Sequence, residues 1–226
     1  MPSGVSPDVA AIRGEIRRFL DQPDVSHRKI GSGKGVYVFY DYDGEPIYVG
    51  QTKESIRSRI GCHLTNQRTD AVAMNVLDPF EVAEIEVWPI YFGKKSKAEA
   101  KRLLSEAEYT VFQRVLRASR LKAVLNEKDI PTTHRVELPK SFRGRIIPDE
   151  LYNLRKHPDT RIARRASTIA NLARVIAERN VSKGLRRTLL TQAKRLALLA
   201  EQRLGEIAED IPVEEEGEET GESVAQ

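Results

Sequence analysis

A set of side chains in the chain could together hydrolyse a phosphodiester bond. The set combines two tyrosines, an arginine, a histidine, a carboxylate and an amide, namely Tyr37, Tyr48, Arg59, His63, Glu106 or Glu108, and Asn126. Hydrolysis needs a base to activate water, a cation to hold the phosphate and a carboxylate to hold a metal ion. These residue types supply each of those parts, provided that the fold brings them together.

The two tyrosines fall on a predicted β-hairpin. Residues 35–40 and 47–50 are rich in β-branched and aromatic side chains, and Asp43-Gly44 between them is typical of a turn. Tyr37 and Tyr48 would therefore lie on neighbouring strands of one sheet. Glycines in both segments, Gly35 and Gly50, would let backbone or substrate approach closely.

Helices are expected to position the remaining side chains. Ser6 and Pro7 are typical of a helix start, and a short helix over about residues 54–66 would carry Arg59 and His63, an i, i+4 pair on one face. An apolar strand is predicted over residues 82–92. The predicted order through this region is helix, two strands, helix, strand and a long helix.

The long helix is expected to carry the carboxylate. Ser96 with Glu99 forms a capping box at its start, and Glu106 and Glu108 both lie within it. Each candidate also has an ordinary interpretation, because tyrosines are common in hairpins and an exposed helical glutamate often pairs with a neighbour one turn away. Asn126 could be a helix C-cap.

The two hairpin segments resemble the name-giving motifs of the GIY-YIG endonuclease superfamily. Gly35-Val36-Tyr37 and Tyr48-Val49-Gly50 have ten residues between their tyrosines, and the family arginine and histidine fall on Arg59 and His63. The family glutamate falls best on Glu108, because apolar residues follow it at i+3 and i+4, and the family asparagine falls on Asn126. The resemblance covers about residues 33–127.

The resemblance implies an α+β fold, in which a small three-stranded antiparallel sheet is flanked by helices. It also implies hydrolysis with one metal ion, Mg²⁺ or Mn²⁺, held by Glu108. Tyr37 would be the general base, and Tyr48 would orient the nucleophile or the phosphate. Arg59 would stabilise the charge of the transition state, and His63 would assist Tyr37 or bind phosphate.

Some positions depart from the family pattern. One extra residue between Gly50 and Arg59 makes Arg57 an alternative arginine. Gln51 stands where repair enzymes of the superfamily usually have lysine, so Lys53 or Lys34 is the alternative source of that charge. Asn126 lies eighteen positions after Glu108, which keeps Glu106 open as the metal ligand. These departures favour a restriction-like or stand-alone enzyme over the excision-repair subunit.

Charge is distributed unevenly along the chain. Its 226 residues include 37 Lys and Arg against 33 Asp and Glu, a net charge of +4, but residues 209–226 hold eight acids and no base. Residues 1–208 therefore carry +12, which favours a polyanionic partner such as nucleic acid. Residues 151–208 predict two basic helices in a hairpin, with 13 basic residues against four acidic ones.

These observations divide the chain into four parts. Residues 1–130 are expected to be a nuclease-like domain with an N-terminal helix, and residues 131–150 a basic linker with three prolines. Residues 151–208 would form a helical hairpin for DNA binding or dimerisation, and residues 209–226 a disordered acidic tail. The residues expected to contact double-stranded DNA are Lys34, Lys53, Arg57, Arg68, Lys140, Arg143, Arg145, Arg164, Arg165, Arg186 and Arg187.

Several classes of protein are excluded. No apolar run approaches the roughly 18 residues of a membrane span, the N-terminus is unlike a secretory signal, and Cys62 is the only cysteine, so we expect a cytoplasmic protein. Four scattered histidines argue against a zinc site. Residues 31–34, Gly-Ser-Gly-Lys, lack the spacing of a phosphate-binding loop and precede a strand, so no nucleotide cofactor is expected.

The leading hypothesis is thus a metal-dependent DNA endonuclease, with restriction favoured over repair of branched DNA or a mobile-element role. A two-strand cut by an enzyme with one site implies a symmetric homodimer. A non-catalytic DNA-binding protein on the same scaffold is the alternative from another class, and an RNA substrate is also open. The segment of residues 66–79 is a candidate for reading base edges through Asn66, Gln67 and Arg68.

Overall fold

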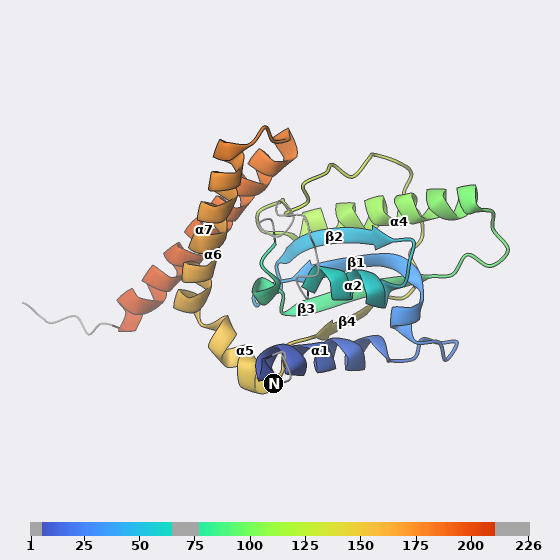
Figure 1. Ribbon diagram of the computed structural model, residues 1–226, viewed down its shortest axis with the longest axis horizontal. Coiled ribbons are helices and arrows are strands. Elements are labelled where there is room, and N and C mark those ends of the chain that lie inside the picture. The colour runs from blue at the N-terminus through green and yellow to red at the C-terminus, as the bar shows by residue number, and fades with distance from the viewer. Residues whose placement is uncertain (1–5, 65–76, 211–226) are drawn as a thin grey trace, which may run out of the picture.

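The computed structural model describes residues 6–64 and 77–210, and a four-stranded antiparallel sheet lies at its centre (Figure 1). The strand order is β2-β1-β3-β4. The strands are β1 (Lys34–Tyr40), β2 (Pro46–Thr52), β3 (Glu84–Ile90) and β4 (Phe142–Arg145). The α+β class is therefore confirmed.

The predicted number of strands is wrong by one. The short strand β4 lies within residues 131–150, which the sequence predicted to be a linker, and it pairs antiparallel with β3. Ile146 and Ile147 after it are buried. Part of that segment is thus built into the sheet and its core.

Alternation along β1 divides the core between the two faces of the sheet. Tyr37 and Phe39 pack with residues of α1 (Pro7–Leu20) and α2 (Ile56–Leu64), whereas Val36 and Val38 pack with residues of α4 (Lys97–Ala118). This is the period of two expected of a strand that is buried on both faces. The central strand therefore presents its motif tyrosine to α2 and not to the long helix.

The helix starts follow from their sequences. Ser96 accepts a hydrogen bond from the backbone of Glu99 and the Glu99 side chain accepts one from the Ser96 backbone, so the predicted capping box is confirmed. Pro7 begins α1 as predicted, although Ser6 makes no side-chain capping bond. Two single-turn 3₁₀ helices, η1 (Ile30–Ser32) and η2 (Pro79–Glu81), precede β1 and β3.

Three helices follow the sheet: α5 (Asp149–Lys156), α6 (Pro158–Glu178) and α7 (Lys183–Asp210). Helices α6 and α7 pack side by side as an antiparallel hairpin (Figure 1). No described helix is both long and apolar enough to cross a membrane.

A buried cluster of charges joins this hairpin to the sheet domain. Asp41 Oδ2, just after β1, lies 3.0 Å from Arg165 Nη2 and 2.5 Å from Arg195 Nη2. Arg165 also contacts Glu81, with 2.9 Å between Nε and Oε2, and Arg161 Nη2 lies 2.6 Å from Asp43 Oδ2. The three guanidinium groups are buried, so each depends on these carboxylates for its charge balance.

Asp41 is therefore expected to be critical for stability. In Asp41→Asn the amide oxygen can still accept the turn bonds that Oδ1 accepts from the backbone of Asp43 and Glu45, but the charge is lost. Removing one partner from a buried ionic cluster costs about 3–5 kcal/mol in the free energy of unfolding. Urea denaturation of the two proteins measures the difference.

Glu84→Gln is the matched control, because Glu84 pairs with Arg143 at the surface, where an ion pair contributes less than about 1 kcal/mol. Equal losses of unfolding free energy in the two variants would show that the buried cluster contributes no more than a surface pair.

Candidate active site

Four of the predicted site residues come together on the α2 side of the hairpin. Tyr37 on β1 and Tyr48 on β2 have ring centroids 6.2 Å apart. The His63 ring on α2 lies 5.3 Å from the Tyr48 ring, and His63 Nε2 is 3.0 Å from the Tyr37 hydroxyl. We call this group, with Arg59, the tyrosine cluster.

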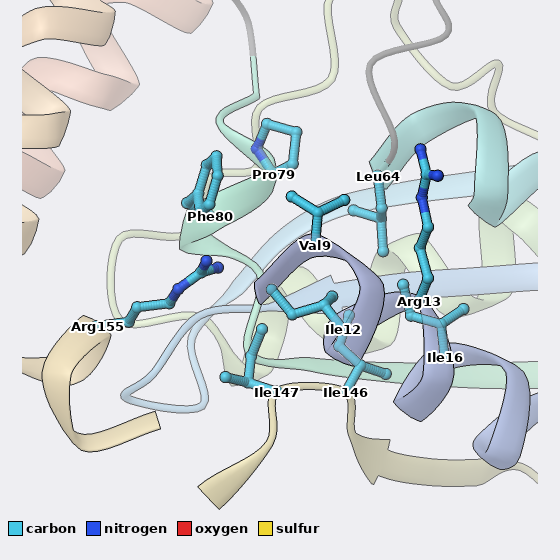
Figure 2. A pocket seen from close by; sticks show the side chains of 10 residues that line it. All are labelled: Val9, Ile12, Arg13, Ile16, Leu64, Pro79, Phe80, Ile146, Ile147 and Arg155. Carbon is cyan, nitrogen blue, oxygen red and sulfur yellow. The ribbon is translucent and has the colours of Figure 1, made fainter. Parts of the chain in front are cut away.

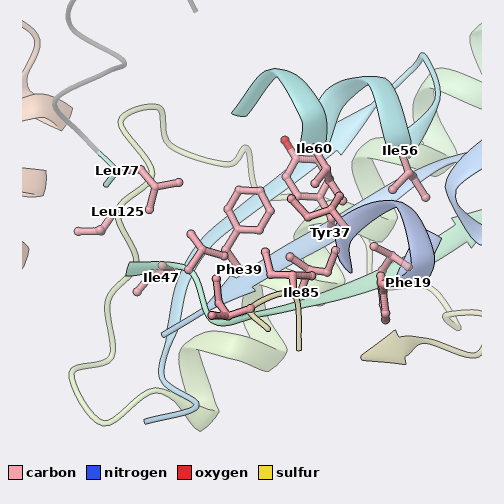
Figure 3. Close-up of a cluster of buried hydrophobic side chains, with 14 of the residues drawn as sticks. Phe19, Tyr37, Phe39, Ile47, Ile56, Ile60, Leu77, Ile85 and Leu125 are labelled. Atoms are coloured by element: carbon pink, nitrogen blue, oxygen red, sulfur yellow. The ribbon is translucent and has the colours of Figure 1, made fainter. Parts of the chain in front are cut away.

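Helix α2 reaches the cluster because one of its faces is apolar. Ile56, Ile60 and His63 occupy the same face and are buried. The backbone N–H of Ile56 donates to the carbonyl of Gly33, 2.8 Å away, which ties the helix start to the chain entering β1. Figure 3 shows Tyr37 pointing from the sheet toward α2, near Ile56 and Ile60. The predicted helix is thus confirmed over the described residues, from Ile56 to Leu64.

Gly50 allows the cluster to pack. It is paired with Tyr37 across the hairpin, and a Cβ atom at this position would lie 2.5 Å from the Tyr37 hydroxyl and 2.9 Å from Cε1 of Tyr48. Both distances are shorter than van der Waals contact. The final glycine of the second motif is therefore required by the close approach of the two phenol rings.

Arg59 supplies positive charge to the tyrosines. Burial lowers the pKa of its guanidinium, but the Tyr37 phenol, by charge and hydrogen bond, and the Tyr48 phenol raise it, and the net shift is upward. The two tyrosines differ in exposure, since Tyr37 is fully buried and Tyr48 is half-buried. The Tyr37 hydroxyl is thus held inside by His63 and Arg59, whereas Tyr48 reaches the surface.

Glu108 approaches strand β2 from the opposite face of the sheet. Gln51, the residue after Gly50, donates a hydrogen bond from Nε2 to Glu108 Oε2 at 2.8 Å. Glu106 instead has its Oε1 3.8 Å from Nε of Arg102, on its own helix. Of the two glutamates, Glu108 is the one linked to the motif strand.

The surroundings of Glu108 disfavour its charged form. Burial raises the pKa of its carboxyl to about 7, and the hydrogen bonds from Gln51 offset this only in part. Glu108 takes part in none of the ion pairs of the described residues. The Gln51 Oε1 atom is buried and has no hydrogen-bond partner among the described residues. The Glu108 carboxylate therefore has an amide N–H beside it and no cation partner among the described residues.

Asn126 acts through the backbone of β2. Its Nδ2 donates to the carbonyl of Val49 at 2.7 Å, and its Oδ1 accepts from the Val49 N–H at 3.0 Å. Both polar atoms of the side chain are thus used to hold the second motif in place. The alternative as a helix C-cap is wrong, because α4 ends at Ala118.

Residues 33–120 match the family model of the GIY-YIG catalytic domain. This segment is a GIY-YIG domain. The matched segment contains the tyrosine cluster and Glu108, whereas Asn126 and the helices α5 to α7 lie beyond it. No curated protein and no solved structure matches the chain significantly. GIY-YIG domains are typically endonucleases that use divalent metal ions, which makes DNA the expected class of substrate.

Glu108 and Gln51 are the residues considered as ligands for a divalent metal ion. Among the described residues, no group of three or more His, Cys, Asp and Glu side chains could enclose a metal ion. Mg²⁺ and Mn²⁺ need no such cage, because Mg²⁺ is usually held by one or two carboxylates and keeps several waters. The Glu108 carboxylate and the buried Oε1 of Gln51 are oxygen donors of the kind that such an ion takes.

A separate pocket of about 100 Å³ opens between α1 and the segment after β4 (Figure 2). Its walls are mainly apolar and include Val9, Ile12, Phe80 and Ile147. Among the described residues that line it, arginines are the only charged ones, and none belongs to the tyrosine cluster. It is therefore not the metal site of the GIY-YIG domain.

The predicted DNA contacts fall into distinct classes. Lys34, Lys53, Lys140 and Arg186 are exposed. Arg165 is buried against Glu81 and Asp41, so it does not face DNA and its predicted role is wrong. The remaining arginines are engaged by carboxylates at the surface, in the pairs Arg57–Asp21, Arg143–Glu84, Arg145–Asp149, Arg164–Asp78 and Arg187–Asp129. Asn66, Gln67 and Arg68 lie outside the described residues.

Glu108 is expected to reduce the stability of the metal-free protein. Its pKa is near 7 in the folded state and 4.5 ordinarily, so ionisation opposes folding as the pH rises from about 4.5 to 7. Glu108→Gln, which removes that charge, should match the parent protein below pH 4.5 and exceed it above pH 7 by roughly 1–3 kcal/mol. Urea denaturation of the parent and the Glu108→Gln variant, in the presence of a chelator at pH 4.5 and pH 8, measures their unfolding free energies.

The exposed Glu99 is the control, because a carboxylate whose pKa is lowered contributes the opposite sign, and Glu99→Gln should lose stability at pH 8. A Glu108→Gln protein that is less stable than its parent at pH 8 would contradict the interpretation.

Proposed function

We propose that the protein is a divalent-metal-dependent DNA endonuclease that hydrolyses phosphodiester bonds. The observation that carries the proposal is the convergence of Tyr37, Tyr48, Arg59 and His63 beside a strand that Glu108 approaches from the other face. A buried hydroxyl with a cation and an imidazole around it has the parts of a proton-transfer site. The family match supports the same class of chemistry.

The Tyr37–His63 pair is the proton-accepting unit. A phenol of ordinary pKa near 10 is a poor base at neutral pH unless a cation favours its phenolate. Arg59 provides that cation, and His63, with Nε2 unprotonated, accepts the Tyr37 proton across 3.0 Å. Because Tyr37 is fully buried, Tyr48 is the tyrosine that orients the attacking water or the phosphate at the surface.

Glu108 would hold the metal ion, with the Gln51 amide oxygen as the second protein ligand. A bound divalent ion would stabilise the negative charge that develops on the phosphate and its leaving oxygen. Its charge would also favour the ionised form of Glu108, because the hydrogen bonds from Gln51 offset the cost of burial only in part. Asn126 is a positioning residue. It holds the backbone of Val49, the residue between Tyr48 and Gly50 in β2.

The exposed basic residues supply sequence-independent attraction to the DNA backbone. Lys34 and Lys53 flank the GIY-YIG hairpin, and Arg186 extends the positive surface onto α7. A compact chain with its own basic helices favours stand-alone cleavage, and restriction is the role we propose. A repair nuclease directed to branched DNA is the second candidate within the same chemistry.

Cleavage of supercoiled plasmid and linear phage DNA with Mg²⁺ tests the proposal. Tyr37→Phe, Arg59→Ala and Glu108→Gln should each lower the rate by about 10²–10³, because each removes a proton acceptor or a stabilising charge from the transition state. Glu150→Gln, an exposed change on α5, is the control and should cleave like the parent. Discrete fragments would indicate restriction, whereas preferential cleavage of branched substrates would indicate repair.

Absence of cleavage on duplex, branched and RNA substrates, together with salt-sensitive DNA binding, would overturn the enzymatic proposal in favour of a non-catalytic DNA-binding protein. A chain whose Tyr37→Phe variant cleaves as fast as its parent would place the chemistry elsewhere.

Gln51 has a separate test in metal affinity, measured by calorimetry with Mn²⁺. Gln51→Leu removes one oxygen ligand and the hydrogen bond to Glu108, so we expect affinity to fall by about 10-fold or more. Gln51→Glu retains an oxygen and adds a charge, so its affinity should equal or exceed that of the parent. Equal affinity of the Leu variant and the parent would remove Gln51 from the site.

A further inference from the structure

Helix α7 carries an apolar line on its outer face. The line consists of Leu190, Ala193, Ala197, Ala200, Leu204 and Ile207, all exposed. The three large side chains are 56%, 70% and 41% exposed, which is unusual for side chains of their size. Their spacing alternates between three and four residues, the pattern of a helix that packs along its length against another helix.

This line is distinct from the face that holds the hairpin together. The inward face of α7 buries Leu185, Thr188, Arg195 and Leu199 against α6 and the sheet domain. Figure 1 shows α6 and α7 crossing, with the C-terminal part of α7 extending away from the sheet. The residues of the outer line therefore stay exposed when α7 packs against α6 and the sheet domain.

The line is complementary to itself when two copies run antiparallel. With a two-fold axis between Ala197 and Ala200, Leu190 faces the partner's Ile207, and Ala193 faces the partner's Leu204. The central alanines face one another, which lets the helices approach closely. In a parallel pairing each residue of the line would face the same residue of the partner, so three layers would contain only alanine. The antiparallel pairing therefore fills the space between the helices better.

The charges beside the line have the same symmetry. Lys194 and Glu201 are seven residues apart, flank the line on one side and are exposed. Neither takes part in an ion pair among the described residues. In the antiparallel arrangement Lys194 lies near the partner's Glu201, and the reciprocal pair forms on the other side of the axis. Opposite charges therefore meet twice in the same interface.

We infer that the outer line of α7 is a homodimer interface, in which two copies of the chain pair antiparallel about an axis between Ala197 and Ala200. The line spans 18 residues, from Leu190 to Ile207, or about 25 Å of helix. A helix pair of this length buries on the order of 1,000 Å² in total, the lower range for a specific interface. A reversible dimer at micromolar concentration is the expected state.

The consequence for cleavage rests on the proposed function. Two GIY-YIG domains related by a two-fold axis are what a nuclease needs to cut both strands of a palindromic site. The dimer itself does not depend on nuclease activity, because its contacts lie on α7 and not in the tyrosine cluster.

Sedimentation equilibrium of the full chain, without DNA or metal, tests the inference. The parent should dimerise, and Leu204→Glu, which places a charge opposite the partner's Ala193, should weaken association at least 100-fold. Leu154→Glu is the matched control, because Leu154 is 67% exposed but lies on α5. That variant should dimerise like the parent, and the circular dichroism spectra of all three should agree.

A charge exchange tests the orientation. Lys194→Glu alone and Glu201→Lys alone should each weaken the dimer, because like charges then meet across the interface. The double variant should recover most of the parent's association, which a merely structural effect of either change would not produce.

A parent chain that stays monomeric at 100 µM, or equal association of the Leu204→Glu and Leu154→Glu variants, would overturn the interface. If the chain dimerises as described but cleaves no substrate, the proposed function fails and the interface stands. If the chain cleaves DNA while it is monomeric, the interface fails and the proposed function stands. If the chain both dimerises and cleaves, Leu204→Glu should change the plasmid product from linear to nicked DNA.

Discussion

The register in which Gly50 faces Tyr37 is the constraint on which the site depends. Because no side chain intervenes, the Tyr37 phenol can lie over β2 and still meet His63 from α2. A shift of the hairpin by one residue would move Tyr37 to the α4 face and bring the glycine opposite a different side chain. Tyr48, Arg59 and His63 can therefore contact the Tyr37 phenol only in this register of the hairpin.

The turn of the same hairpin also anchors the C-terminal helices. Asp41 follows β1 directly, uses one oxygen to cap the turn and the other to bind Arg165 and Arg195. The element that fixes the register of the tyrosines is thus the element that fixes α6 and α7. The helical hairpin and the GIY-YIG domain therefore form one structural unit and not two bodies joined by a tether.

Local patterns predicted the elements that carry the site. The motif tyrosines, the helix with Arg59 and His63 and the capping box at Ser96 are all short-range signals, and the structure has each of them. Two features depended on contacts between distant residues. The Gln51–Glu108 hydrogen bond spans 57 residues. Arg165 resembled a surface charge, although its position one turn after Arg161, on the face that continues to Leu172, was a signal that it could be buried.

The short strand β4 has a consequence for where the catalytic domain ends. A segment cut at residue 130, where the sequence alone suggested a boundary, would lack Phe142–Arg145 and leave β3 with unpaired backbone N–H and C=O groups. Exposed strand edges of this kind recruit strands from other molecules and lead to aggregation. The four residues of β4 therefore cover the edge of β3. A fragment of the GIY-YIG domain that keeps this edge paired has to include them.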